Sequence, residues 1–226
     1  FGPDFTNRRT GRFTGSQTQA RRGGSAVANT LYEYSFNYTL ENILNYGKSF
    51  GQHSLNVTAL QSLQKDNFEN ATIDGLVVPI ESQQFYALGQ ASVINKPGSN
   101  LAEWTLNSYM GRVNYDFAGK YLITLTGRYD GSSRFGANNK YGFFPSAAIG
   151  WNISEEGFLK GSKWLEQLKL RASYGSIGNT AINTYETQTF LAATTYAFGT
   201  TGAFGYRPST LGNPDLTWES TATANV

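Results

Sequence analysis

The stretch Tyr32-Glu33-Tyr34-Ser35-Phe36-Asn37-Tyr38-Thr39-Leu40 decides the fold class of this 226-residue chain. Aromatic or aliphatic side chains occupy its even positions, and polar or charged side chains occupy its odd positions. Successive side chains of a β-strand point to opposite faces. Strict alternation therefore predicts a strand with one apolar face and one polar face.

Further stretches repeat this alternation, and no long amphipathic helix is predicted. They cover approximately residues 55–63, 109–117, 121–130, 143–153, 168–174 and 216–226. Four strands carry a pair of charged residues on the face opposite the aromatics: Glu33/Glu41, Arg112/Asp116, Arg128/Asp130 and Lys169/Arg171. The pattern predicts an all-β protein of about seven antiparallel, two-faced strands.

Composition excludes several classes of function. The chain has no cysteine, one histidine (His53), 15% charged residues and a net charge of +2. Disulfides, cysteine-ligated metals and multi-histidine metal sites are therefore excluded, and the charge gives no basic footprint for nucleic acid. No motif has the pattern of a phosphate, dinucleotide or calcium loop. We expect no catalytic residue, no metal and no cofactor, and we do not predict an enzyme.

Connector lengths favour a transmembrane barrel over a soluble sandwich. Ala118-Gly119-Lys120 is a tight turn, whereas residues 66–100 form a long polar stretch and residues 175–214 form a second long connector. Outer-membrane barrels have short periplasmic turns and long extracellular loops, and they keep charges off the lipid-facing side. Aromatic residues near the expected strand ends suit an interfacial girdle, although β-propensity alone also places aromatics in strands. These are Trp104, Phe117, Tyr121, Phe143, Trp151 and Trp218.

The second long connector is rich in aromatic residues. It contains Tyr185, Phe190, Tyr196, Phe198, Phe204 and Tyr206. Exposed aromatics can stack on the apolar faces of sugars or contact a partner protein. They can equally pack a loop on itself, and the sequence leaves both interpretations open.

A series of motifs between Ser108 and Val226 closely resembles, in content and in order along the chain, the barrel of SusC/RagA-type TonB-linked outer-membrane transporters. Asp130-Gly131-Ser132-Ser133-Arg134-Phe135-Gly136 comes first, and residues 140–156, 168–175 and 213–219 follow in the same order as in that family. The family-motif residues are expected to be structural, and no substrate contact is carried over. They are Asp130, Gly131, Arg134, Phe135, Gly136, Pro145, Asn213, Pro214, Trp218 and Glu219.

The resemblance implies a 22-stranded barrel around a plug domain. Residues 1–226 would then be part of the barrel domain, with the plug and the signal peptide outside this segment. Such transporters lie in the outer membrane of Gram-negative bacteria, in contact with its lipid. They import oligosaccharides or peptides with TonB-derived energy, contact the TonB complex through an N-terminal region and pair with a SusD-like surface lipoprotein. The polar strand face, including Glu33 and Glu219, would line the barrel interior.

Two alternatives remain open from the sequence. One is a small passive or structural outer-membrane barrel of eight strands. The other is a secreted carbohydrate-binding β-sandwich, in which the residues from Tyr32 to Leu40 would be buried in a protein core. The barrel hypothesis places them against lipid, so it predicts that Phe36→Arg blocks membrane assembly.

Overall fold

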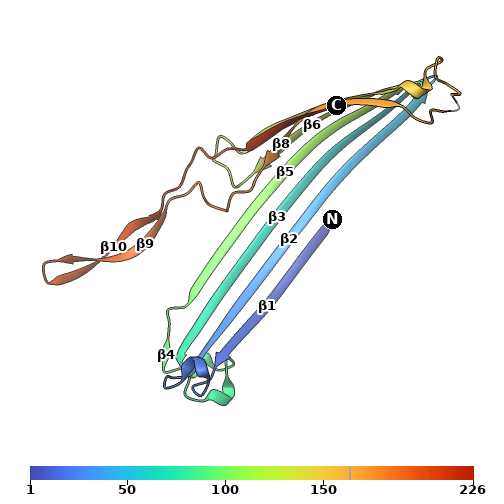
Figure 1. Cartoon of the computed structure of the whole chain (residues 1–226). Coiled ribbons are helices and arrows are strands. Elements are labelled where there is room, and N and C mark those ends of the chain that lie inside the picture. Colours follow the sequence, from blue (N-terminus) through green and yellow to red (C-terminus); the bar gives the residue numbers. More distant parts are fainter. Residues whose placement is uncertain (163) are drawn as a thin grey trace. The chain divides into compact units, whose positions relative to one another are not determined.

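β-Strands dominate the computed structural model, which describes residues 1–162 and 164–226 (Figure 1). The strands are β1 Gly2–Thr14, β2 Val27–Phe50, β3 His53–Val77, β4 Val93–Ile94, β5 Gly98–Phe117, β6 Tyr121–Ser132, β7 Tyr141–Asn152, β8 Lys169–Asn179, β9 Phe190–Phe198, β10 Thr201–Thr210 and β11 Glu219–Asn225. Short 3-10 turns join some of them: η1 Gln19–Arg21, η2 Glu81–Gln83, η3 Leu88–Gln90 and η4 Ile153–Glu155. Within these residues no helix is long and apolar enough to cross a membrane.

Nine of the strands form one sheet in the order β1-β2-β3-β5-β6-β7-β8-β11, with β4 paired to β3. β5 to β8 follow one another as antiparallel neighbours. β9 and β10 form a separate two-stranded hairpin, inserted in the chain between β8 and β11. The predicted all-β, antiparallel fold is confirmed. The sheet is open in this segment and has more strands than the eight-stranded alternative requires.

The chain divides into two compact units. The first contains Phe1–Thr39 and Lys65–Trp104, and the second contains Leu40–Gln64 and Thr105–Val226. β2, β3 and β5 contribute residues to both, and Figure 1 shows these strands running side by side. The parts of β2, β3 and β5 in the second unit are each close in length to β6 and β7, which have 12 residues each.

The first unit has a small apolar core of its own. Ala26, Ala28, Val78 and Leu88 are buried together, and Phe13, Ile73, Phe85 and Ala91 pack against them. The backbone N–H of Val78 donates to the carbonyl of Ala26 at 3.1 Å. The connection between β3 and β5 is therefore folded onto the residues that precede β2.

Several expected boundaries in this unit are wrong. Residues 66–100 were expected to form a polar connector, but β3 continues to Val77 and β5 begins at Gly98. β1 was not expected at all, yet it pairs with β2 over its whole length. Polar side chains occupy both faces here, so no alternation marks the strands. Backbone pairing, which needs no apolar side chain, forms them instead.

Candidate functional site

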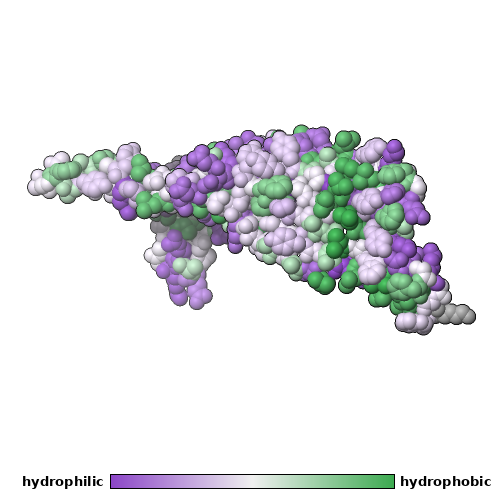
Figure 2. Space-filling model, turned by 90° about the horizontal axis from the view of Figure 1, so that it is seen from above, coloured by the Kyte–Doolittle hydropathy of each residue, from purple (hydrophilic) through white to green (hydrophobic). Residues whose placement is uncertain are grey.

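The sheet of the second unit has one apolar face. Strand pairing aligns Val113, Leu125 and Ala147 across β5, β6 and β7, and Tyr174 of β8 lies beside Ala147. These residues line a shallow hollow, yet Leu125 is 52% exposed and Tyr174 is 57% exposed. Figure 2 shows hydrophobic side chains gathered in a patch on the surface. An exposed apolar patch of this kind indicates contact with a non-aqueous neighbour.

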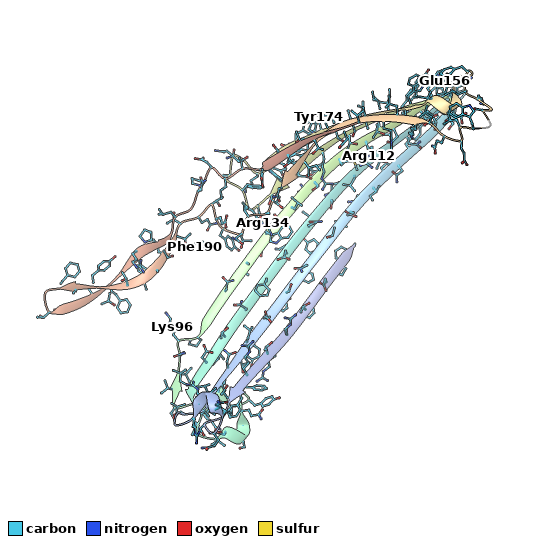
Figure 3. The ribbon with its side chains drawn as sticks, in the orientation of Figure 1. Lys96, Arg112, Arg134, Glu156, Tyr174 and Phe190 are labelled. Atoms are coloured by element: carbon cyan, nitrogen blue, oxygen red, sulfur yellow. The ribbon has the colours of Figure 1, made fainter. Side chains whose placement is uncertain are left out.

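The opposite face of the same strands is polar. Asn114, Thr124 and Ala148 are aligned there, and the Thr124 hydroxyl donates to Asn114 Oδ1 at 2.9 Å. Lys169 and Arg171 of β8 line a hollow on this face. Strand pairing also places Arg112, Asp116 and Arg128 on it; Figure 3 labels Arg112 on β5 and Tyr174 of the apolar face on β8. The predicted separation of charges from aromatics is confirmed in these strands.

The aromatic stripe of β2 lies in a polar setting in the first unit. Tyr32 and Tyr34 line a hollow together with Asn7 and Glu69. The guanidinium of Arg9 lies 5.4 Å from the Tyr32 ring centroid. Arginine and carboxylate groups beside these rings would be costly to place in hydrocarbon. These neighbours favour water over lipid around the first half of the stripe, so the lipid contact expected from the sequence stays a prediction there.

The family motifs meet where β6 ends and β7 begins. Phe135 is 2% exposed, and its ring centroid lies 4.8 Å from that of Trp218. The Phe144 ring meets Trp218 edge-on at 5.2 Å, and Trp218 Nε1 donates to the carbonyl of Lys140 at 2.9 Å. We call residues 130–136, Phe144 and residues 213–218 the rim cluster.

Backbone contacts join the two loops of the rim cluster. The N–H of Gly136 donates to the carbonyl of Leu216 at 3.1 Å. A Cβ atom on Gly136 would lie 1.8 Å from the carbonyl oxygen of Pro214, so only glycine allows this approach. The loop is also held on its other side, because Arg134 Nη1 donates to the carbonyl of Thr180 at 3.0 Å. Figure 3 labels Arg134 at this end of β6.

The other motif residues have defined surroundings. Arg128 Nε donates to Asp130 Oδ2 at 2.8 Å, and Asn179 Nδ2 donates to Glu219 Oε2 at 3.1 Å. The Tyr141 ring covers Gly131, Pro145 is paired with Gly127, and the Asn213 side chain accepts the N–H of Asp215 at 3.0 Å. Each of these contacts is made within the chain, and the structural role of the motif residues stays a prediction.

Two predicted girdle residues lie elsewhere than expected. Trp218 was assigned to the apolar face of a strand covering residues 216–226, but β11 begins only at Glu219. Its ring packs in the rim cluster because Phe135 and Phe144 offer an aromatic surface that strand alternation does not reveal. Trp104 lies inside β5 rather than near a strand end. Phe117 and Tyr121 do lie at a turn, with their rings stacked at 6.3 Å.

A carboxylate joins two turns at the opposite end of the β5–β8 strands. Glu156 accepts hydrogen bonds from Lys120 Nζ at 2.8 Å, Tyr121 Oη at 2.7 Å and Trp151 Nε1 at 3.1 Å. Three hydrogen bonds lower the pKa of Glu156 from 4.5 to about 2. The bond from the Lys120 ammonium has the largest effect, and those from Tyr121 and Trp151 have smaller ones. We call these four residues the turn clasp, and Figure 3 labels Glu156 beside the turn.

The aromatic residues of the long connector form an exposed hairpin. Tyr196 and Phe198 lie on one face of β9–β10, and Phe204 and Tyr206 lie on the other, as the strand register shows. Phe198 is 72%, Phe204 88% and Tyr206 73% exposed. These three rings therefore do not pack the loop on itself. Tyr185 precedes the hairpin and lies 6.4 Å from the Phe190 ring at its base.

The described residues contain no group of three or more histidine, cysteine, aspartate or glutamate side chains that could hold a metal. His53 packs against neighbouring aromatic side chains. Its Nδ1 lies 2.6 Å from the Tyr115 hydroxyl, and its ring stacks on Phe50.

Comparison with known proteins agrees with this architecture. A family model described as "TonB dependent receptor-like, beta-barrel" matches residues 1–226. The chain is 38% identical to TonB-dependent receptor P3 of Formosa agariphila over 97% of its own length and 22% of the relative's. It is 33% identical to TonB-dependent receptor SusC of Bacteroides thetaiotaomicron, covering 87% of this chain and 19% of SusC.

Solved structures show the same fold. The RagAB peptide transporter superposes with a TM-score of 0.87 at 26% identity, covering 97% of this chain and 24% of that one. The open-open state of the RagAB peptide importer gives a TM-score of 0.78. The chain thus spans about a quarter or less of the proteins that it matches. Proteins of the matched family lie in the outer membrane of Gram-negative bacteria, and these relatives are named as TonB-dependent receptors and a peptide transporter. The chain belongs to the TonB-dependent receptor β-barrel family.

Proposed function

We propose that this segment forms part of the wall of an active outer-membrane transporter that imports oligosaccharides or peptides. The observation that carries the proposal is the two-faced sheet of the second unit. Its strands approximate the 9–11 residues that a tilted strand needs to cross a bilayer. The Leu125 and Tyr174 face would then contact lipid, and the Lys169 and Arg171 face would line the barrel interior.

The strands of the first unit would lie outside the hydrocarbon. β2 has 24 residues and β3 has 25, which is more than twice the length that a spanning strand requires. The parts of these strands in the first unit carry Lys65, which forms an ion pair with Glu103 at 3.0 Å. Charged pairs and an exposed tyrosine surface suit an aqueous environment on the extracellular side.

The exposed hairpin would supply contacts to the cargo or to a partner. An isolated two-stranded hairpin is marginally stable in water. Contact of exposed rings such as Phe204 with the cargo or a partner would stabilise it. RagAB, which this chain resembles, is named as a peptide transporter, and SusC is named as a TonB-dependent receptor. These names support a SusD-like lipoprotein partner and TonB-derived energy for the protein that contains this segment.

The test begins with outer membranes solubilised in mild detergent. The polypeptide that contains this sequence is expected to be several times heavier than 24.8 kDa and to co-purify with a lipoprotein. Deletion of the tonB gene is expected to abolish uptake of the cargo while leaving the barrel in the membrane. A free 24.8 kDa chain in the soluble fraction would contradict the proposal.

A further inference from the structure

The connector between β7 and β8 is tied to the apolar side of the sheet. Glu156 lies in this connector and accepts hydrogen bonds from Tyr121 Oη at 2.7 Å and Trp151 Nε1 at 3.1 Å (Figure 3). Tyr121 is paired with Trp151 and is four residues from Leu125 on β6, so all three side chains belong to the apolar face. The connector is therefore fixed to the side of the sheet that carries the apolar residues.

Backbone hydrogen bonds hold the residues that follow Glu156. Its carbonyl oxygen accepts the N–H groups of Leu159 at 2.9 Å and Lys160 at 2.8 Å. The two ends of the connector are joined as well, because the N–H of Ser154 donates to the carbonyl of Leu168 at 3.2 Å. The connector therefore has a fixed base at this end of β7 and β8.

Phe158 and Trp164 of this connector are aromatic residues with highly exposed side chains. Phe158 is 74% exposed and Trp164 is 82% exposed. Removing apolar rings from water is favourable, so these side chains favour contact with a partner. Tryptophan combines an apolar body with a polar N–H, and it is frequent where a bilayer meets water. The two rings suit the boundary between lipid headgroups and acyl chains.

The charged groups of the connector restrict the choice of partner. Lys160 Nζ lies 3.5 Å from Glu155 Oε2, and these side chains are 70% and 50% exposed. Ion pairs this exposed are weak in water, so both groups can also bind charges outside the chain. A zwitterionic phospholipid headgroup offers a phosphate to Lys160 and an ammonium to Glu155. A partner of a single charge would match only one of the two.

We propose that the connector between β7 and β8 is an anchor on the surface of a zwitterionic phospholipid leaflet. The rings of Phe158 and Trp164 lie at the boundary between headgroups and acyl chains, and the turn clasp holds the connector there through Glu156. This inference rests on the proposed function, which places the apolar face of the second unit in lipid. It adds a partner surface outside the strands.

The test attaches a bimane fluorophore at residue 158 through the Phe158→Cys variant of the full-length transporter. The protein is reconstituted in vesicles of phosphatidylethanolamine and phosphatidylcholine, and unsubstituted protein labelled in the same way gives the background. Lipids that carry a spin label near the headgroup or near the chain end quench the fluorophore at different depths. We expect the headgroup-proximal spin label to quench at least about twofold more strongly than the chain-end label.

Two control positions on β6 calibrate the quenching. Leu125→Cys on the apolar face is expected to be quenched by both lipids, and Thr124→Cys on the polar face by neither. A third variant tests the turn clasp. Glu156→Ala removes the acceptor that binds Tyr121 and Trp151, and it is expected to lower headgroup-proximal quenching at residue 158 about twofold or more.

Each contrary result overturns a defined part of the inference. A label at residue 158 that responds like Thr124→Cys would overturn the anchor. Shielding of this label from both lipids and from aqueous iodide would also overturn it and would indicate a protein partner. Headgroup-proximal quenching that persists in Glu156→Ala would overturn the role of the turn clasp. Absence of quenching at Leu125→Cys would refute the transmembrane wall, whereas quenching there with none at residue 158 would refute only the anchor.

Discussion

Replacing Gly136 with alanine should release the rim cluster. The added Cβ would lie 1.8 Å from the Pro214 carbonyl oxygen, which is a backbone atom that cannot rotate away. Residues 213–218 must therefore shift, which breaks the hydrogen bond from Gly136 N to Leu216 O at 3.1 Å. Overpacking by one methyl group costs about 1–3 kcal/mol, and a lost hydrogen bond costs about 1 kcal/mol.

The combined loss of about 2 kcal/mol or more corresponds to an approximately thirtyfold larger population of the open loop. Trypsin added to the purified protein in detergent measures it, because cleavage after Arg134 requires this loop to open. We expect cleavage at Arg134 to accelerate about thirtyfold in Gly136→Ala when opening is fast relative to cleavage. Gly157→Ala is the matched control, since no atom lies within 4 Å of its added Cβ. An unchanged cleavage rate at Arg134 in Gly136→Ala would refute the reasoning.

Three further predictions concern the turn clasp and the two units. Because hydrogen bonding lowers the pKa of Glu156 from 4.5 to about 2, the clasp stabilises the turn above pH 4.5 and loses this contribution as the pH falls toward 2. Hydrogen exchange at Lys120, corrected for intrinsic rates, should be constant from pH 7 to 5 and rise below about pH 4; a rise between pH 7 and 5 would contradict this. Leu125→Arg should cost about 2–4 kcal/mol and reduce heat-modifiable barrel in the outer membrane, whereas Thr124→Arg on the polar face should not. The Phe36→Arg variant in the first unit should assemble normally. A loss of heat-modifiable barrel equal to that of Leu125→Arg would instead place the aromatic stripe of β2 in lipid.

Local alternation predicted much of the second unit. The period of two in residues 109–117, 121–130 and 143–153 identified β5, β6 and β7 and assigned Leu125 and Arg112 to opposite faces. This prediction succeeds because a strand between lipid and a polar interior must alternate residue by residue. The sequence also showed that the long connector is rich in aromatic residues. It did not predict that these residues lie on two faces of a hairpin.

The sequence alone therefore determined the fold class and the two faces of the spanning strands, since both follow from the local direction of side chains. Tertiary structure decided the length of β3, which continues to Val77 because backbone pairing does not require an apolar face. It also placed Trp218 against Phe135 and left Asp130 Oδ1 without a hydrogen bond among the residues that the structure describes. These features depend on contacts between segments far apart in the chain, and no local periodicity encodes such contacts.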